Sequence, residues 1–199
     1  MAPHPSMLLT LHAVRLLGFT DTSPAARRFG QYPDDVERLL IDAGAHGWAV
    51  RSSFGGTRGW SLTVAGRTEN ERLLTEELDH AGGLAVVTGV LADFARVNAG
   101  VVAACSQLQL GWLSAGSRPN GIDPATQQTF AQALAASKEL ELRLTAVLPR
   151  FSGYAARLQM AVENAATDPA WLTATDRDSF HRVWFELHED LIATLGIRR

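Results

Sequence analysis

The chain has 199 residues, of which 46% are hydrophobic and 20% carry a charge. This composition is typical of a folded globular protein and argues against a disordered one, and the length suits one large or two small domains. The net charge of −3 argues against a generally basic nucleic-acid-binding protein, so any nucleic-acid surface must be a local patch of basic residues.

The cysteine content and the apolar stretches indicate in which cellular compartment the protein is expected. Cys105 is the only cysteine, which excludes an internal disulfide and a cluster of thiolate metal ligands. The first residues lack the basic, apolar and small-residue order of a secretory signal. The longest apolar stretch, residues 84–104, is interrupted by polar side chains that make it too polar to span a bilayer: Thr88, Asp93, Arg96 and Asn98. We therefore expect a cytoplasmic protein without a membrane-spanning segment.

Start and stop signals near the beginning of the chain predict three helices. Apolar residues recur at helical spacing over residues 7–17. A short second helix follows a capping residue at Asp21 or Thr22 and stops at Gly30. A third helix begins at Pro33, because proline is favoured in the first turn of a helix.

The next segment, GWAVRSSFGGTRGWSLTVAGR over residues 47–67, predicts two short strands around a glycine hairpin. Trp48 and Val50 alternate along the first strand and are expected to share one face of it. Arg58 lies between glycines at the turn, where no core is available for its side chain. Thr63 can cap the helix that follows the second strand.

The remainder of the chain is predicted to be helical. A charged helix ends at Gly82–Gly83, the strongest boundary signal in the sequence, so we expect domains at 1–82 and 83–199. One long helix or two shorter ones follow. The expected helices of the second domain cover residues 84 to about 110, 124–148, 152–166 and 176–195.

The order of helix, short helix, turn, helix, two-stranded wing and helix resembles the winged helix-turn-helix of MarR-type bacterial regulators. ARRFG resembles the small-residue helix and glycine turn of that family. VERLLIDAGAHGWAVR resembles the recognition helix running into the first wing strand, and GGTRGWSLTVAGR resembles the wing tip and the helix after it. The resemblance covers residues 7 to about 80. It implies a mainly α-helical, homodimeric transcriptional regulator that binds double-stranded DNA.

The same resemblance implies which side chains contact DNA. They come from the short helix, the turn, the third helix and the wing: Arg27, Arg28, Gln31, Tyr32, Arg38, Arg51 and Arg58. The third helix also carries outward carboxylates that are unfavourable near phosphate: Asp34, Asp35, Glu37 and Asp42. Two functions therefore stay open. One is a DNA-binding regulator, and the other is a ligand-sensing or protein-interaction module that keeps the winged-helix shape without binding DNA.

The second domain is expected to sense an effector or to form the dimer. Its aromatic and histidine side chains either pack the core or line a pocket for a small apolar effector: Trp112, Phe130, Tyr154, His181, Trp184 and His188. The two histidines of the last helix are seven residues apart, which does not suit a shared metal ion. Because no catalytic motif is found, we expect no enzymatic activity, no metal and no cofactor.

Overall fold

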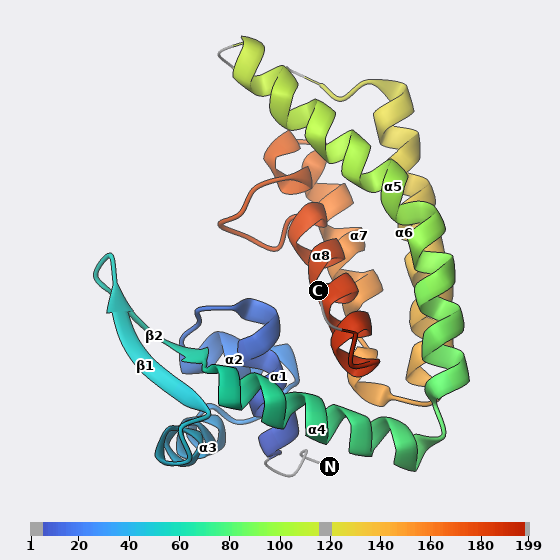
Figure 1. Ribbon diagram of the computed structural model, residues 1–199. Helices are drawn as coiled ribbons and strands as arrows, with labels where there is room; N and C mark the ends of the chain where they lie inside the picture. The colour runs from blue at the N-terminus through green and yellow to red at the C-terminus, as the bar shows by residue number, and fades with distance from the viewer. Residues whose placement is uncertain (1–5, 116–120, 198–199) are drawn as a thin grey trace. The chain divides into compact units, whose positions relative to one another are not determined.

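The computed structural model describes residues 6–115 and 121–197 of the chain (Figure 1), with only the backbone described for Phe54 and for residues 112–115. The protein is mainly helical and contains one two-stranded antiparallel sheet. It divides into two compact units, Met1–His80 together with Ala193–Arg199, and Ala81–Ile192. The main break falls close to the Gly82–Gly83 boundary expected from the sequence, and each unit is considered by itself below.

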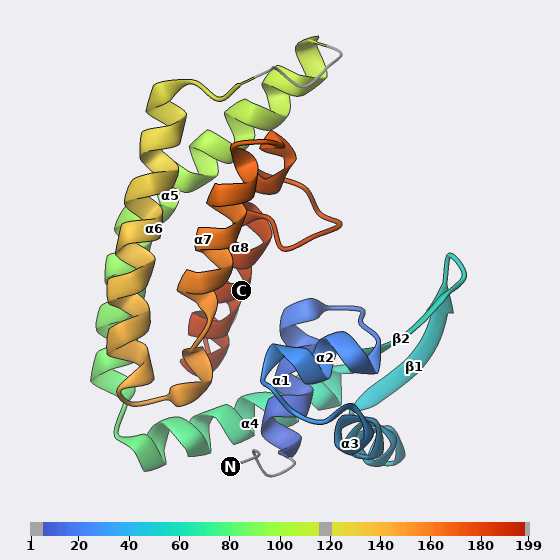
Figure 2. The ribbon, with the colours of Figure 1, turned by 180° about the vertical axis from the view of Figure 1, so that it is seen from behind.

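The first unit contains the elements expected for residues 7–81. They are α1 (Met7–Leu17), α2 (Thr22–Arg28), α3 (Pro33–Ala45), β1 (Ala49–Phe54), β2 (Thr57–Leu62) and α4 (Val64–Ala81). Their shared core is apolar and includes Leu11 of α1, Ala26 of α2, Leu40 of α3 and Trp60 of β2. The hairpin of β1 and β2 extends away from the three helices in both views (Figures 1 and 2).

Local signals explain where the first helices begin and end. The Asp21 side chain accepts a hydrogen bond from the backbone N–H of Thr22 at 2.7 Å, which confirms a cap at this point. Pro33 is the first residue of α3. Gly30 and Gly47 have φ values of 64° and 72°, a left-handed backbone that glycine adopts without strain. The stop predicted at Gly30 is therefore confirmed, and Gly47 follows the end of α3 in the same backbone conformation.

A segment outside the hairpin also pairs with the sheet, which no pattern in the sequence predicts. β1 and β2 pair with Ala49 opposite Leu62 and Phe54 opposite Thr57. On the outer edge of β2, the N–H of Trp60 donates to the carbonyl of Thr20 at 2.7 Å, and the N–H of Thr20 donates to the carbonyl of Trp60 at 3.1 Å. The segment between α1 and α2 thus supplies a one-residue third strand that ties the hairpin to the helices.

The start of α4 is fixed by Thr63 and Gly66. The Thr63 hydroxyl accepts a hydrogen bond from the N–H of Gly66 at 3.0 Å, which confirms the predicted cap, and it lies 2.6 Å from the carbonyl oxygen of Gly47. A Cβ atom on Gly66 would lie 1.9 Å from the carbonyl oxygen of Trp48. The backbone after α3 and the first turn of α4 therefore approach so closely that only glycine fits.

The second unit is a set of helices with no strand among its described residues. Its elements are α5 (Leu84–Ala115), α6 (Pro124–Thr145), η1 (Pro149–Phe151), α7 (Tyr154–Ala165), η2 (Pro169–Leu172) and α8 (Phe180–Thr194), whose last residues belong to the first unit. α5 is one continuous helix that lies beside α6 in both views (Figures 1 and 2). Stacked aromatic rings form much of the core, with 4.6 Å between the centroids of Phe94 and Trp184.

Buried ion pairs join α8 to η1 and α7. Arg150 pairs with Asp190, and both side chains are almost fully buried. The Tyr154 hydroxyl donates to the same carboxylate at 2.8 Å. Arg157 donates two hydrogen bonds to Glu186, at 2.8 and 2.7 Å. Burial alone would lower the pKa of Arg157, but the hydrogen bonds to Glu186 raise it, so this arginine stays charged inside the unit.

α5 is long and apolar enough over Leu84–Gly111 to cross a membrane by length and composition, a criterion that core helices also meet. The polar side chains that interrupt this apolar stretch form ion pairs and hydrogen bonds within the second unit. Asp93 forms ion pairs with Arg96 and with Arg143 of α6, at 2.9 and 2.7 Å. Asn98 accepts a hydrogen bond from the indole of Trp184 at 2.9 Å. The expected absence of a membrane-spanning segment stays a prediction.

Candidate functional site

The tip of the hairpin presents an arginine to solvent. Gly55 and Gly56 form the turn with φ values of 57° and 81°, which place the two strands in register. Arg58 lies directly across from Ser53 in the sheet and is exposed. Within the described part of the chain its guanidinium has no hydrogen-bond or ion-pair partner. The charge of Arg58 is therefore available to an external anion.

Arg51 shares a face of the hairpin with Arg58, because cross-strand partners and alternate residues of a strand point to the same side. Arg51 pairs across the sheet with Trp60, and its guanidinium lies 5.3 Å from the centre of that indole ring. It also donates a hydrogen bond to Glu37 of α3 at 3.0 Å. The base of the hairpin is thus attached to α3 through an ion pair that neutralises Arg51.

The exposed face of α3 combines acidic and apolar side chains. Arg38 forms an ion pair with Asp35 one turn earlier, so its charge is partly compensated. Tyr32 and Ile41 are exposed by 58% and 55%. A shallow hollow of about 290 Å³ runs along this face beside Ile41. This helix is therefore poorly supplied with groups that attract phosphate.

The other residues predicted to contact DNA lie on the short helix α2 and in the turn after it. Arg27 is exposed, whereas the guanidinium of Arg28 lies 4.5 Å from the centre of the Phe29 ring and is half-buried. Gln31 is buried: its carbonyl oxygen accepts from the N–H of Ser6 at 3.0 Å, and its amide donates to Thr10 at 3.4 Å. The expected DNA contact by Gln31 is corrected accordingly, because its amide tethers the chain before α1 to α1 itself.

The predicted effector residues do not come together around one cavity. Trp184 and Tyr154 are fully buried core residues with hydrogen bonds to Asn98 and Asp190. His188 stacks on Phe94 at 5.2 Å. The His181 ring contacts the Phe185 ring in a tilted arrangement with 4.5 Å between centroids, and burial lowers the pKa of His181. The side chain of Trp112 lies outside the described residues. Of the five residues with described side chains, Phe130 is the one that lines the pocket described next.

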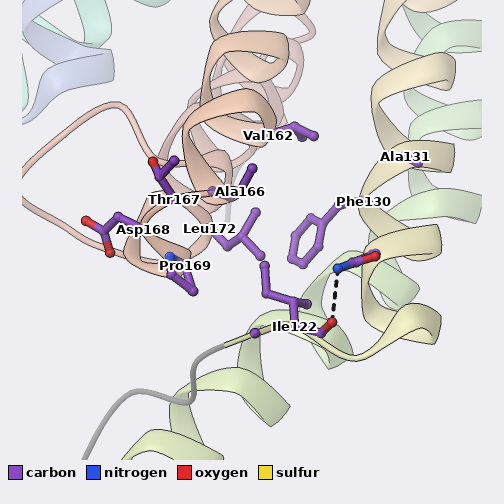
Figure 3. Close-up of a pocket in the computed structure, with 12 residues that line it drawn as sticks. Ile122, Phe130, Ala131, Val162, Ala166, Thr167, Asp168, Pro169 and Leu172 are labelled. Atoms are coloured by element: carbon purple, nitrogen blue, oxygen red, sulfur yellow. Dashed lines mark hydrogen bonds between the residues drawn. The ribbon is translucent and has the colours of Figure 1, made fainter.

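A pocket of about 690 Å³ lies in the second unit between α6, α7 and η2 (Figure 3). Of its lining residues the sequence singled out only Phe130, because the walls come from two distant segments, 121–131 and 162–172, with no shared spacing. Eight apolar side chains form most of the lining: Ile122, Phe130, Ala131, Val162, Ala165, Ala166, Pro169 and Leu172. Figure 3 shows Ile122, Leu172 and the Phe130 ring turned toward a common space.

The described residues contain no group of three or more His, Cys, Asp or Glu side chains placed to hold a metal ion. Cys105 is buried on α5, and desolvation raises the pKa of its thiol to about 12. This thiol therefore stays protonated and behaves as an apolar core group.

Comparison of the chain with protein-family models, with curated proteins and with solved structures finds no match. The function is therefore argued from the two sites above: the arginine-bearing hairpin beside α3, and the apolar pocket of the second unit.

Proposed function

We propose that this protein is a cytoplasmic, homodimeric transcriptional regulator that binds double-stranded DNA and responds to a small apolar effector. Its first unit would be a winged helix-turn-helix of the MarR type, with α2 and α3 as the helix-turn-helix and the β1–β2 hairpin as the wing. The observation that carries the proposal is the exposed Arg58 at the hairpin tip, which has no partner within the described chain. A cation held on a narrow projection suits contact with a phosphate backbone.

The bridge between Thr20 and Trp60 supports the same interpretation. It inserts a short strand between the first two helices, so the order becomes helix, strand, helix, helix, strand, strand, helix. In this arrangement the hairpin lies next to α3, and both can approach one duplex. Arg27, Tyr32 and Arg38 are the remaining exposed candidates on α2 and α3 for base or phosphate contacts.

In the proposed homodimer, the second copy of the chain would bind along α5. This helix buries its apolar side chains on one face, yet Ala92, Ala99, Ala103 and Leu110 are exposed on the opposite face at helical spacing. Arg96 lies on the same face and is exposed, so this face is mostly small and apolar with one charge. A second α5 would cover it and would also provide the two-fold symmetry that paired half-sites require. Sedimentation equilibrium should then give twice the mass of the chain.

A salt-titrated binding assay tests the proposal. The full chain is titrated with fluorescent duplex DNA from its own promoter region and with a shuffled duplex of the same composition. We expect tighter binding to the promoter and a linear fall in log affinity with log salt concentration, because bound phosphates release counterions. Equal and salt-insensitive binding to both duplexes, or no binding at low salt, would overturn the DNA-binding proposal.

One observation favours the second candidate, a protein-interaction module with no DNA ligand. The exposed face of α3 places the apolar Ile41 among Asp34, Asp35 and Asp42. Such a face suits a partner that is apolar and basic. If α3 binds DNA, Ile41→Glu should weaken that binding, because it adds a further carboxylate; if α3 is a protein-interaction face, the same change should have no effect on any residual affinity for DNA.

A further inference from the structure

The pocket between α6, α7 and η2 is large and mostly apolar. Its volume of about 690 Å³ lies within the range of small-molecule sites in proteins. Phe130 and Leu172 are only 2% exposed to water, so they form its floor. The Phe130 ring is held in place by an edge-on contact with Phe180, with 4.9 Å between centroids. The floor is therefore supported from behind by the core.

The polar groups of the lining are already bonded within the chain. The Gln127 amide donates to the carbonyl of Ile122 at 3.0 Å (Figure 3), and the Thr167 hydroxyl donates to the carbonyl of Asn164 at 3.0 Å. Asp168 accepts hydrogen bonds from the N–H of Ala170 at 3.0 Å and from Arg177 at 3.1 Å. Figure 3 shows the Asp168 carboxylate turned away from Phe130, at the rim of the pocket.

The charges of the lining residues determine whether the pocket accepts a charged or an uncharged ligand. No cationic side chain occurs among the described lining residues, and the one ionised group is the carboxylate at the rim. An anion entering this space would lose its hydration without gaining a partner, which is costly in an apolar site. An uncharged apolar molecule loses little on entry and gains contact with Phe130, Leu172 and Ile122.

We propose that this pocket binds an uncharged, largely hydrocarbon molecule of two or three rings and rejects anions of the same shape. The inference rests on the effector part of the proposed function and names the site and the ligand class. It moves the effector site away from the histidines of α8 and onto the segments 121–131 and 162–172.

Two fluorescent probes of matched shape test this assignment. N-phenyl-1-naphthylamine is uncharged, and 8-anilinonaphthalene-1-sulfonate is the same ring system with a sulfonate. Titrated into the full chain without DNA, the uncharged probe should bind at one site, and the sulfonate should bind at least about tenfold more weakly. Equal affinities, or no saturable binding of the uncharged probe, would overturn the proposal.

A filled-pocket variant shows whether binding occurs at this site. Ala131→Phe places a ring into the pocket from an exposed position of α6 and should weaken binding of the uncharged probe at least about tenfold. Ala135→Phe, one turn further along the same helix and outside the lining, is the matched control and should bind as the unmodified chain does. Circular dichroism checks that both variants are folded. Equal affinities in the two variants would exclude this pocket.

The probe titration is independent of the DNA assay. If the uncharged probe binds the pocket while promoter DNA does not bind, the regulator proposal fails and the pocket assignment stands. If promoter DNA binds and the probe does not, the pocket assignment fails and the regulator proposal stands. Adding the uncharged probe to the DNA assay then measures whether the two sites are coupled.

Discussion

The carboxylate of Glu37 on α3 lies 3.0 Å from the guanidinium of Arg51 on β1 and also accepts a hydrogen bond from the hydroxyl of Thr22 on α2. One acidic side chain thus joins the two helices of the proposed helix-turn-helix to the base of the hairpin. The same contact occupies an arginine that the sequence assigns to DNA. The acidity of α3 therefore has a structural use, and it also limits how much positive charge the hairpin presents.

Replacing Glu37 should change DNA affinity through Arg51. Glu37→Gln keeps the shape of the side chain and removes its charge, so Arg51 becomes available to phosphate. We expect tighter DNA binding at low salt and a salt slope that is steeper by about one unit. The gain should disappear in the double variant with Arg51→Ala. If the double variant retains it, the effect comes from the general loss of a negative charge and not from Arg51.

Arg58→Ala should weaken binding to all DNA sequences alike. Loss of one phosphate contact predicts a salt slope that is flatter by about one unit. The melting temperature should stay nearly constant, because an exposed turn residue supports little of the fold. Lys138→Ala removes an exposed cation from α6, outside the first unit and outside the proposed dimer face, and is the control, with no expected change in DNA affinity. Unchanged affinity and slope in Arg58→Ala would favour the interaction module.

Gly66→Ala should destabilise the first unit by about 3 kcal/mol, because its Cβ would overlap the carbonyl oxygen of Trp48 and neither backbone segment can move freely. Gly111→Ala is the matched control on α5, where a Cβ meets no atom within 4 Å. Alanine favours the helix there by up to about 1 kcal/mol. Urea unfolding measures both changes, and equal effects would contradict the close approach of Gly66 and Trp48.

Arg150→Met should destabilise the second unit by about 3–5 kcal/mol, since it removes the cation from a buried pair and leaves the Asp190 charge in an apolar setting. Tyr154→Phe removes only the second donor to that carboxylate and should cost about 1.5 kcal/mol. Urea midpoints of the two variants give the order of the effects. A loss in Arg150→Met no larger than in Tyr154→Phe would contradict a fully buried charge on Asp190.

His181 should make stability depend on pH in one direction. Burial lowers the pKa of His181 in the folded chain from its ordinary value of 6.5, so the folded state disfavours the protonated ring. The free energy of unfolding is therefore unaffected by this titration above pH 6.5 and decreases as the pH falls below it. His181→Gln should therefore gain stability relative to the unmodified chain between pH 7.5 and 5.5 in urea unfolding. A constant difference across this range would show that His181 does not titrate differently on folding.

Elements with strong local signals could be predicted from the sequence. The first helix is confirmed at Met7–Leu17, and the third starts at Pro33 as expected. The last helix starts later than expected, at Phe180, because the residues before it are used elsewhere: Asp176 and Arg177 pair with each other, and Ser179 accepts a hydrogen bond from the N–H of Arg182.

The faces of the first strand were predicted less well. The alternation of Trp48 and Val50 predicted only that they share a face and did not identify the buried one, which holds Ala49, whereas Val50 is 49% exposed. The reason lies across the sheet, where Ala49 and Arg51 share the side that contains Trp60. A small alanine fits the tight space beside α3, and hydrophobic ranking alone cannot identify that space.

Long-range pairs account for most of what the sequence could not predict in the candidate sites. Glu186 and Asp190 bind arginines that lie 29 and 40 positions earlier in the chain. No local period connects such positions. The pocket is a similar case, because Phe130 and Leu172 meet only after α6, α7 and η2 have packed.

The two buried ion pairs also have a consequence for how α8 aligns with η1 and α7. Asp190 and Glu186 lie one helical turn apart on α8, and they meet Arg150 of η1 and Arg157 of α7 in reverse order along the chain. Sliding α8 by a turn past these two elements would separate at least one carboxylate from its arginine and leave both charges away from water. Leucine side chains of similar size would accept such a displacement at small cost, whereas these four charges restrict α8 to a single alignment.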